Sequence, residues 1–179
     1  MLIRREASFL LLVDLQERLL PAIEAGAGVL AASLRLLSAA ERLGVARFAT
    51  EHCADKIGRL VGEVRDRLSA DSILPKRTFA ATEDQAIRAR LASAPRQAIV
   101  CGVEAHVCML QAALGLSSMG KEVFVVADAV GSRRGRDREL ALGRLAHSGV
   151  TVVSGEMVLF EWLHNADDPA FRDFLKVIR

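Results

Sequence analysis

The sequence predicts an α/β fold: one three-layer α/β/α domain, residues 1–179, built on a six-stranded, parallel, doubly wound (Rossmann-like) sheet. Three observations predict this class. Short apolar runs alternate with helical segments along the chain. The runs are continuous rather than alternating in polarity, which is typical of strands covered on both faces. No repeat, low-complexity tract or linker divides the chain into two domains.

The elements follow from where each run stops. The first run lies between Ser8 and Asp14, and glycines close several helical segments. We expect strands over Phe9–Val13, Val45–Thr50, Ser72–Leu74, Gln97–Cys101, Val123–Ala127 and Val150–Val153. We expect helices around Pro21, over Val29–Leu43, from a capping box at Thr82–Gln85 to about Ser93, over Val107–Met119 and Asp137–His147, from a Ser154 cap to Leu163, and after Pro169.

Composition excludes several classes of function. Lys and Arg number 24 against 22 Asp and Glu, a net charge of +2, and aromatic residues make up only 4% with no tyrosine. Neither the charge nor the base-stacking surface of a nucleic-acid-binding protein is present. No apolar stretch reaches the ~18 residues of a membrane span. The three cysteines are an odd number and give no disulfide framework, so we expect a reducing, cytoplasmic location.

Three chemically active side chains each follow the end of an expected strand. Asp14 follows the first strand, Lys76 follows the third, and Cys108 lies shortly after the fourth. Parallel strands present their carboxyl ends at one edge of the sheet, and ligands bind there at the switch point. We therefore expect these three residues to share one edge.

Cys108 is the candidate nucleophile, in the first turn of its expected helix. Lowering a thiol pKa from ~8.5 to ~6.5 requires about 2.7 kcal/mol. A helix N-terminus supplies only ~0.3–1 kcal/mol, or ~2 in a favourable geometry, so a cation is also needed. Lys76 is the obvious supplier. The alternative is that Cys108 is a small core residue.

Each of the other candidates also has a plainer interpretation. Asp14, with Glu17 three residues on, could be a general base or a helix N-cap. Lys76 could be a solvated loop residue. His52 and Cys53 are adjacent possible metal ligands, but no second pair follows at metal spacing, so we predict no metal. His106 could line a pocket or face solvent, and Cys101 fits an inert core position.

The arginines after the fifth strand, Arg133, Arg134, Arg136 and Arg138, could bind an anion. The acidic residues interleaved among them favour a solvated loop and helix start instead. The nearby Gly131 and Gly135 do not form a phosphate-binding loop, and we predict no cofactor.

Three blocks of the chain, Leu12–Gln16, Leu74–Phe79 and Cys101–Cys108, together match a known pattern. They resemble the first-strand Asp-x-Gln block, the lysine block and the nucleophile block of the isochorismatase-like cysteine hydrolase superfamily, which includes nicotinamidases, N-carbamoylsarcosine amidases and isochorismatases. Their order, spacing and expected elements agree over nearly the full length.

The resemblance implies a catalytic triad of Asp14, Lys76 and Cys108. It implies a cis peptide bond between Val103 and Glu104, and an oxyanion hole formed by the backbone N–H groups of Glu104 and Cys108. It also implies a substrate pocket and a homo-oligomer, a dimer or higher. The pocket residues it suggests are Gln16, Phe79, Val103 and His106.

Two differences from the motifs of known superfamily members indicate which branch of the superfamily the chain resembles. Thr50–Ala54 lacks the Asp-x-His metal motif of nicotinamidases, and Cys108 argues against the vinyl-ether chemistry of dedicated isochorismatases, which lack this cysteine. The chain is most similar to metal-free isochorismatase-domain hydrolases. We therefore expect a hydrolase acting on a small amide or related C–N substrate through a thioester. The alternatives are isochorismatase-like hydrolysis of a small metabolite, and a redox-sensing thiol or vestigial scaffold.

Overall fold

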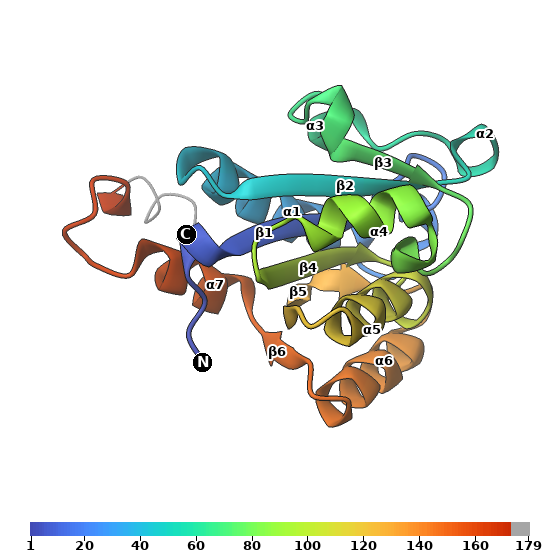
Figure 1. Cartoon of the computed structure of the whole chain (residues 1–179). Helices are drawn as coiled ribbons and strands as arrows, with labels where there is room; N and C mark the ends of the chain where they lie inside the picture. Colours follow the sequence, from blue (N-terminus) through green and yellow to red (C-terminus); the bar gives the residue numbers. More distant parts are fainter. Residues whose placement is uncertain (173–179) are drawn as a thin grey trace.

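A computed structural model describes residues 1–172 and has the predicted fold (Figure 1). A six-stranded sheet, parallel throughout, has the order β3-β2-β1-β4-β5-β6. The strands are β1 (Ser8–Val13), β2 (Ala46–His52), β3 (Ile73–Lys76), β4 (Gln97–Val103), β5 (Glu122–Gly131) and β6 (Thr151–Val153). The helices are α1 (Gly26–Arg42), α2 (Ala54–Ile57), α3 (Gly62–Arg65), α4 (Gln85–Ala92), α5 (Leu110–Ser118), α6 (Gly135–His147) and α7 (Gly155–Leu163).

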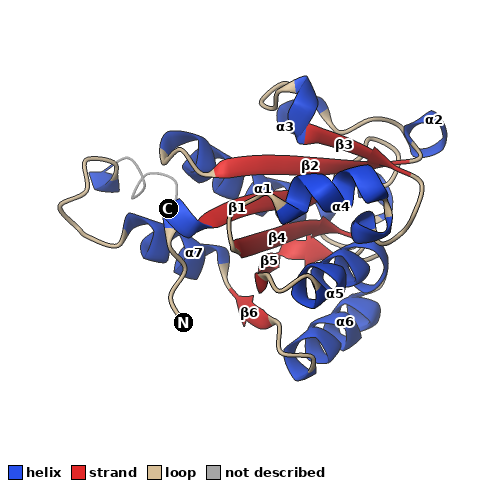
Figure 2. Ribbon diagram, viewed as in Figure 1, coloured by secondary structure: helices blue, strands red, loops and turns tan. Residues whose placement is uncertain are grey.

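Helices cover both faces of the sheet (Figure 2). Strand β1 is buried along its whole length, and its side chains divide between two cores. Leu10 and Leu12 pack in the core that includes buried residues of α1 and α7. Phe9, Leu11 and Val13 pack in the core with residues of α4, α5 and α6. This division explains why the run is continuously apolar.

The order of the strands reverses between β1 and β4. The chain first builds outward from β1 through β2 to β3, then returns to place β4 on the other side of β1. In the β1–β4 register, Leu12 lies opposite Cys101 and Val13 opposite Gly102. The carboxyl ends of these two strands therefore form the crevice where a doubly wound sheet binds ligands.

Some boundaries differ from the prediction for identifiable reasons. β5 runs on to Gly131, because its pairing with β4 shifts register and resumes at Val130. The expected capping box at Thr82 is wrong. Residues 81–83 form a 3-10 turn, and Asp84 caps α4 by accepting hydrogen bonds from the N–H groups of Ala86 and Ile87.

The ends of the chain complete the comparison. Pro21 lies in a 3-10 turn rather than an α-helix. Ser154 caps α7 as predicted, by accepting a hydrogen bond from the N–H of Met157. Most of the expected helical tail after Pro169 lies outside the described residues. Within residues 1–172, every helix is too short or too polar to cross a bilayer.

Candidate active site

Asp14 directly follows β1, and its carboxylate is enclosed by protein. The chain turns there with a positive φ of 50°, and the side chain is fully buried. The Thr50 hydroxyl donates to Oδ1 over 2.6 Å, and the Lys76 ammonium donates to Oδ2 over 2.8 Å. The helix-cap interpretation is wrong, because no helix begins at Asp14. Instead Gln16 forms an antiparallel bridge with Leu60.

Lys76 is the last residue of β3 and is not a solvated loop residue. Only 4% of the residue is exposed, and its charged end is closed off from water. Besides Asp14, its Nζ donates to the Thr78 carbonyl over 3.3 Å. Strand β2 lies between β1 and β3 in the sheet. Asp14, which follows β1, and Lys76, at the end of β3, therefore form a buried ion pair across the end of β2.

Cys108 lies in a π-helical turn, Ala105–Met109, between β4 and α5. The expected helix from Val107 is wrong in this respect, because α5 starts only at Leu110. Cys108 is 6% exposed, its sulfur lies within 4.8 Å of an Asp14 carboxylate oxygen, and the charges of Asp14 and Lys76 both act on the thiol. The structure therefore brings the three predicted residues into one cluster.

The protonation of Cys108 differs from the expectation. Burial, followed by the negative charge of Asp14, raises the pKa of the Cys108 thiol to about 12, and Lys76 only partly opposes this. The thiol is therefore protonated at pH 7, with an Asp14 carboxylate oxygen within 4.8 Å of its sulfur.

The backbone that leads from β4 to Cys108 depends on a glycine. Gly102 has φ +113°, and a Cβ at this position would lie 2.1 Å from the carbonyl oxygen of Val13. Only glycine lets the end of β4 come this close to the end of β1. The next peptide bond, Val103–Glu104, is cis, as predicted. The Glu104 carboxylate accepts hydrogen bonds from Nε and the backbone N–H of Arg133, both over 3.0 Å.

The predicted pocket residues Gln16, Val103 and His106 lie in three different environments. Gln16 is buried, and its amide donates to the His52 and Gly58 carbonyls and accepts from the His52 N–H, so it holds the loop after β2. Val103 is fully buried in the core. His106 turns its Nδ1 to the Ser132 hydroxyl over 3.0 Å. The oxyanion hole and the substrate-pocket roles stay predictions.

Phe79 and His52 form a stacked pair at the triad. Their ring centroids lie 5.3 Å apart at 28°, and Phe79 is 54% exposed. One ring nitrogen of His52, one Asp14 oxygen and the Cys108 sulfur all lie within 4.8 Å of one another. From the sequence we consider His52 only as a possible metal ligand. Its position at the end of a strand, at the same end of the sheet as Asp14, Lys76 and Cys108, is the signal that would have identified it as a candidate site residue.

Asp14, His52 and Cys108 are residue types that bind metals, but the charges around them disfavour a bound cation. The Lys76 ammonium already lies 2.8 Å from the Asp14 carboxylate and would repel a divalent cation. The thiol, with a pKa of about 12, would also have to lose a tightly held proton. These residues therefore suit proton transfer better than metal binding.

Three of the four clustered arginines, Arg133, Arg136 and Arg138, contact the protein's own groups. Arg133 pairs with Glu104, and Arg136 with Glu139 over 3.3 Å. Arg138 donates to the carbonyls of Val130 and Ala127, which fixes the end of β5. These contacts favour the solvated loop and helix start over an anion site.

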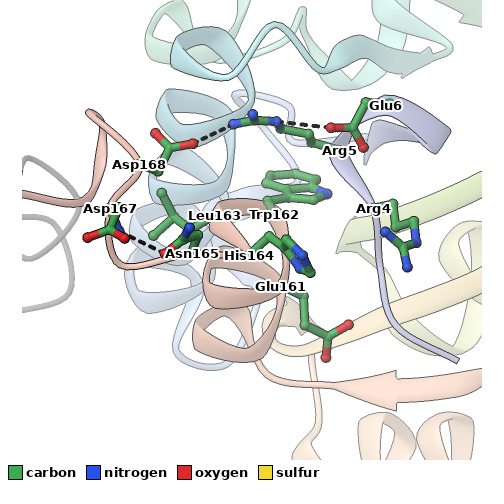
Figure 3. A pocket seen from close by; sticks show the side chains of 10 residues that line it. All are labelled: Arg4, Arg5, Glu6, Glu161, Trp162, Leu163, His164, Asn165, Asp167 and Asp168. Carbon is green, nitrogen blue, oxygen red and sulfur yellow. Dashed lines mark hydrogen bonds and ion pairs between the residues drawn. The ribbon is translucent and has the colours of Figure 1, made fainter.

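Two cavities lie at opposite ends of the strands. One, of about 480 Å³, is lined by Lys76 and by residues of β2, β3 and α2, but not by Asp14 or Cys108. The other, of about 300 Å³, lies at the opposite edge of the sheet among residues that precede β1 and residues of α7 (Figure 3). There Arg5 bridges Glu6 and Asp168, and none of the triad residues takes part.

Comparison with known proteins agrees with the geometry. The isochorismatase domain family matches residues 8–157. Isochorismatase domain-containing protein 1 of Danio rerio is 36% identical over 168 residues. That match covers 93% of this chain but 59% of the relative, so the chain spans only part of that protein's length.

Solved structures share the fold over almost the whole chain. The MAR1 ribonuclease of Caenorhabditis elegans superposes with a TM-score of 0.92 at 29% identity, covering 99% of this chain and 92% of that one. The YcaC gene product of Escherichia coli, an octameric hydrolase of unknown specificity, superposes with a TM-score of 0.90 at 21% identity, covering 99% and 95%. With its hydrolase fold and its clustered Asp14, Lys76 and Cys108, the chain belongs to the isochorismatase family.

Proposed function

We propose that this protein is a cysteine hydrolase that cleaves the C–N bond of a small amide or related substrate through a thioester on Cys108. The observation that carries the proposal is the buried cluster of Cys108, Asp14 and Lys76, in which Lys76 donates to Asp14 and the Cys108 sulfur lies within 4.8 Å of an Asp14 oxygen. A neutral thiol beside a carboxylate is arranged for general-base activation.

The first half of the reaction follows from these contacts. As the Cys108 sulfur attacks the acyl carbon, its proton passes to Asp14, and the carbonyl electron pair moves onto oxygen. When the C=O bond re-forms, the C–N bond breaks, and Asp14 returns the proton to the leaving nitrogen. Ammonia or an amine departs, and a thioester remains on Cys108.

Lys76 and the backbone stabilise the charges that develop in these steps. The Lys76 ammonium lies beside Asp14 and stabilises both its carboxylate and the developing thiolate. The N–H groups of Glu104 and Cys108 are the proposed donors to the oxyanion, and the close turn after Gly102 supports that assignment. Each such donor is worth roughly 10²–10³ in rate in a comparable hydrolase.

The test is release of ammonia from a panel of small amides by the wild-type protein and by Cys108→Ala. We expect at least one amide to be turned over by the wild type, and loss of that turnover in the variant. Cys108→Ala changes few atoms in a buried position, and its fold is checked by circular dichroism. Equal turnover by the two proteins would contradict the proposal.

The alternatives predict different outcomes. A vinyl-ether hydrolase would keep its activity in Cys108→Ser. A redox sensor would form a reversible adduct at Cys108 with mild peroxide while hydrolysing no amide. Although the C. elegans relative is named a ribonuclease, we do not propose RNA as the substrate, because a buried thiol and ion pair suit a small acyl group better. RNA is nevertheless included in the panel as a control substrate.

We further propose that the chain forms a homo-oligomer. The octameric state of YcaC supports this, as does the outer face of α7, where Met157 and Phe160 are 48% and 42% exposed one turn apart. Light scattering coupled to gel filtration should give a mass above that of one chain. Phe160→Glu should lower this mass.

A cytoplasmic location, expected from the three free cysteines, is tested by cell fractionation.

A further inference from the structure

His52 brings a second acid–base group to the reactive centre. One of its ring nitrogens lies within 4.8 Å of both the Cys108 sulfur and an Asp14 oxygen. Its Nδ1 is buried and has no hydrogen-bond partner within residues 1–172. Gln16 holds the backbone on both sides of the residue, and the Phe79 ring stacks on the imidazole. The imidazole is thus fixed in place with unused hydrogen-bonding capacity.

The spacing places the imidazole within reach of a water that attacks an acyl group on the sulfur. One ring nitrogen and the Cys108 sulfur lie within 4.8 Å of each other. A water that donates a hydrogen bond of about 2.8 Å to that nitrogen can approach an acyl carbon bonded to the sulfur. A general base acting through one water needs this arrangement.

Asp14 is less well placed for the same task. It is fully buried, and its two oxygens already accept hydrogen bonds from Thr50 and Lys76. Cys108 is 6% exposed, whereas His52 is half-buried, so His52 is the most exposed residue of the three.

We propose that His52 is a catalytic residue: the general base that activates the hydrolytic water in the second half of the reaction. This inference rests on the proposed thioester at Cys108 and assigns its hydrolysis to a residue outside the triad.

The step balances without any further reactant. An O–H bond of water breaks and its proton passes to the neutral imidazole, while the water oxygen bonds to the thioester carbon and the carbonyl electron pair moves to oxygen. When the C=O bond re-forms, the C–S bond breaks. The thiolate of Cys108 then takes the proton from His52, which restores the neutral thiol and releases a carboxylic acid.

The surroundings of His52 keep the imidazole neutral. Burial, and after it the positive charge of Lys76, lowers the pKa of His52 below its ordinary value of 6.5. Asp14 and a hydrogen bond with the Thr78 backbone oppose this, and Arg77 adds to it. Glu51, the neighbouring acid, instead accepts a hydrogen bond from the Leu60 N–H. A neutral imidazole at pH 7 can accept a proton, which a general base requires.

The experiment separates the two halves of the reaction with p-nitrophenyl acetate, an activated acyl ester, as the probe. Release of p-nitrophenolate reports acylation, and intact mass with peptide mapping follows the acetyl group on Cys108. The proteins are the wild type, His52→Gln, His52→Phe and His147→Gln. His52→Phe keeps an aromatic ring against Phe79 but has no base. His147 is an exposed residue of α6, remote from the site, whose Nδ1 contacts the Gly143 carbonyl, so His147→Gln is the matched control.

We expect both His52 variants to be acetylated at close to the wild-type rate and to lose the acetyl group roughly 100-fold more slowly or worse. The wild-type deacetylation rate should fall on acidification through a pKa below 6.5, and both variants should lack that inflection. Wild-type deacetylation and pH dependence in His52→Gln or His52→Phe would overturn the inference while leaving the thioester intact. Failure of the wild type to be acetylated at Cys108 would instead overturn the proposed function and this inference together.

Discussion

The buried pair of Lys76 and Asp14 provides the sharpest test of the site's energetics. Lys76→Met keeps the length and apolar stem of the side chain and removes its charge. The side chains of both residues are fully inaccessible to solvent, so water cannot replace the lost ammonium. The carboxylate of Asp14 would keep its hydrogen bond from Thr50 but would lose its countercharge.

The magnitude follows from the 2.8 Å separation of Nζ and Oδ2. At an effective dielectric constant of about 20, the attraction is about 6 kcal/mol before the cost of burying the charges is subtracted. Removing one partner of a buried pair costs about 3–5 kcal/mol of unfolding free energy, because an uncompensated charge remains. We expect a loss in this range for Lys76→Met.

Urea denaturation at pH 7 measures the effect, in the wild type, Lys76→Met, Asp14→Asn and the double variant. The double variant should cost less than the sum of the single variants by about 1–3 kcal/mol, because neither charge is left unpaired. Lys56→Met, at an exposed lysine, should stay within about 0.5 kcal/mol of the wild type. The reasoning would be refuted if the loss of unfolding free energy in the double variant equalled the sum of the two single losses. It would also be refuted if Lys76→Met lost as little as Lys56→Met.

Three further predictions concern the Cys108 thiol, the turn at Gly102 and the hydrogen bond from Thr50 to Asp14. Alkylation of Cys108 by iodoacetamide should still be rising with pH at pH 10, because burial raises the thiol's pKa to about 12; a plateau near pH 7 would contradict this. Gly102→Ala should lose at least about 2 kcal/mol in urea denaturation, because its Cβ would overlap the backbone of Val13 and its φ is +113°; unchanged stability would argue against the close approach. Thr50→Val leaves one Asp14 oxygen without its donor and should cost about 1–3 kcal/mol; calorimetry that finds no change would remove Thr50 from the site.

The parallel sheet and the grouping of the triad follow from local patterns. Continuous apolar runs predict strands that are buried on both faces, and β1 shows why, since alternate side chains serve two cores. Once the strands are parallel, residues at their carboxyl ends must share an edge. Asp14, Lys76 and Cys108 meet for that reason, although 62 residues separate the first two.

The details around Cys108 depend on tertiary structure. Ala105, His106 and Val107 suit an α-helix as well as a π-helical turn, so the sequence does not distinguish them. A helix N-terminus acts on the thiol only through local charge, whereas burial, which the sequence does not show, has the largest effect on the pKa of Cys108. The D-x-x-E spacing at Asp14 suggested a cap, because capping depends on local residues while the partner, Lys76, is remote.

His52 shows a different limit. A single histidine beside a cysteine indicates a possible metal ligand, and only the folded sheet places its ring against Phe79 and next to the triad. The same holds for Thr50, whose hydroxyl has no sequence motif to connect it with Asp14.

The central claim is that Cys108 carries the acyl group during hydrolysis. The most direct measurement is an acid quench in steady-state turnover of the amide that releases ammonia, followed by peptide mapping for a hydroxylamine-sensitive adduct. The account predicts a thioester on Cys108 in the wild type, and neither adduct nor turnover in Cys108→Ala. Turnover that proceeds in Cys108→Ala, or with the acyl group on another residue, would contradict it.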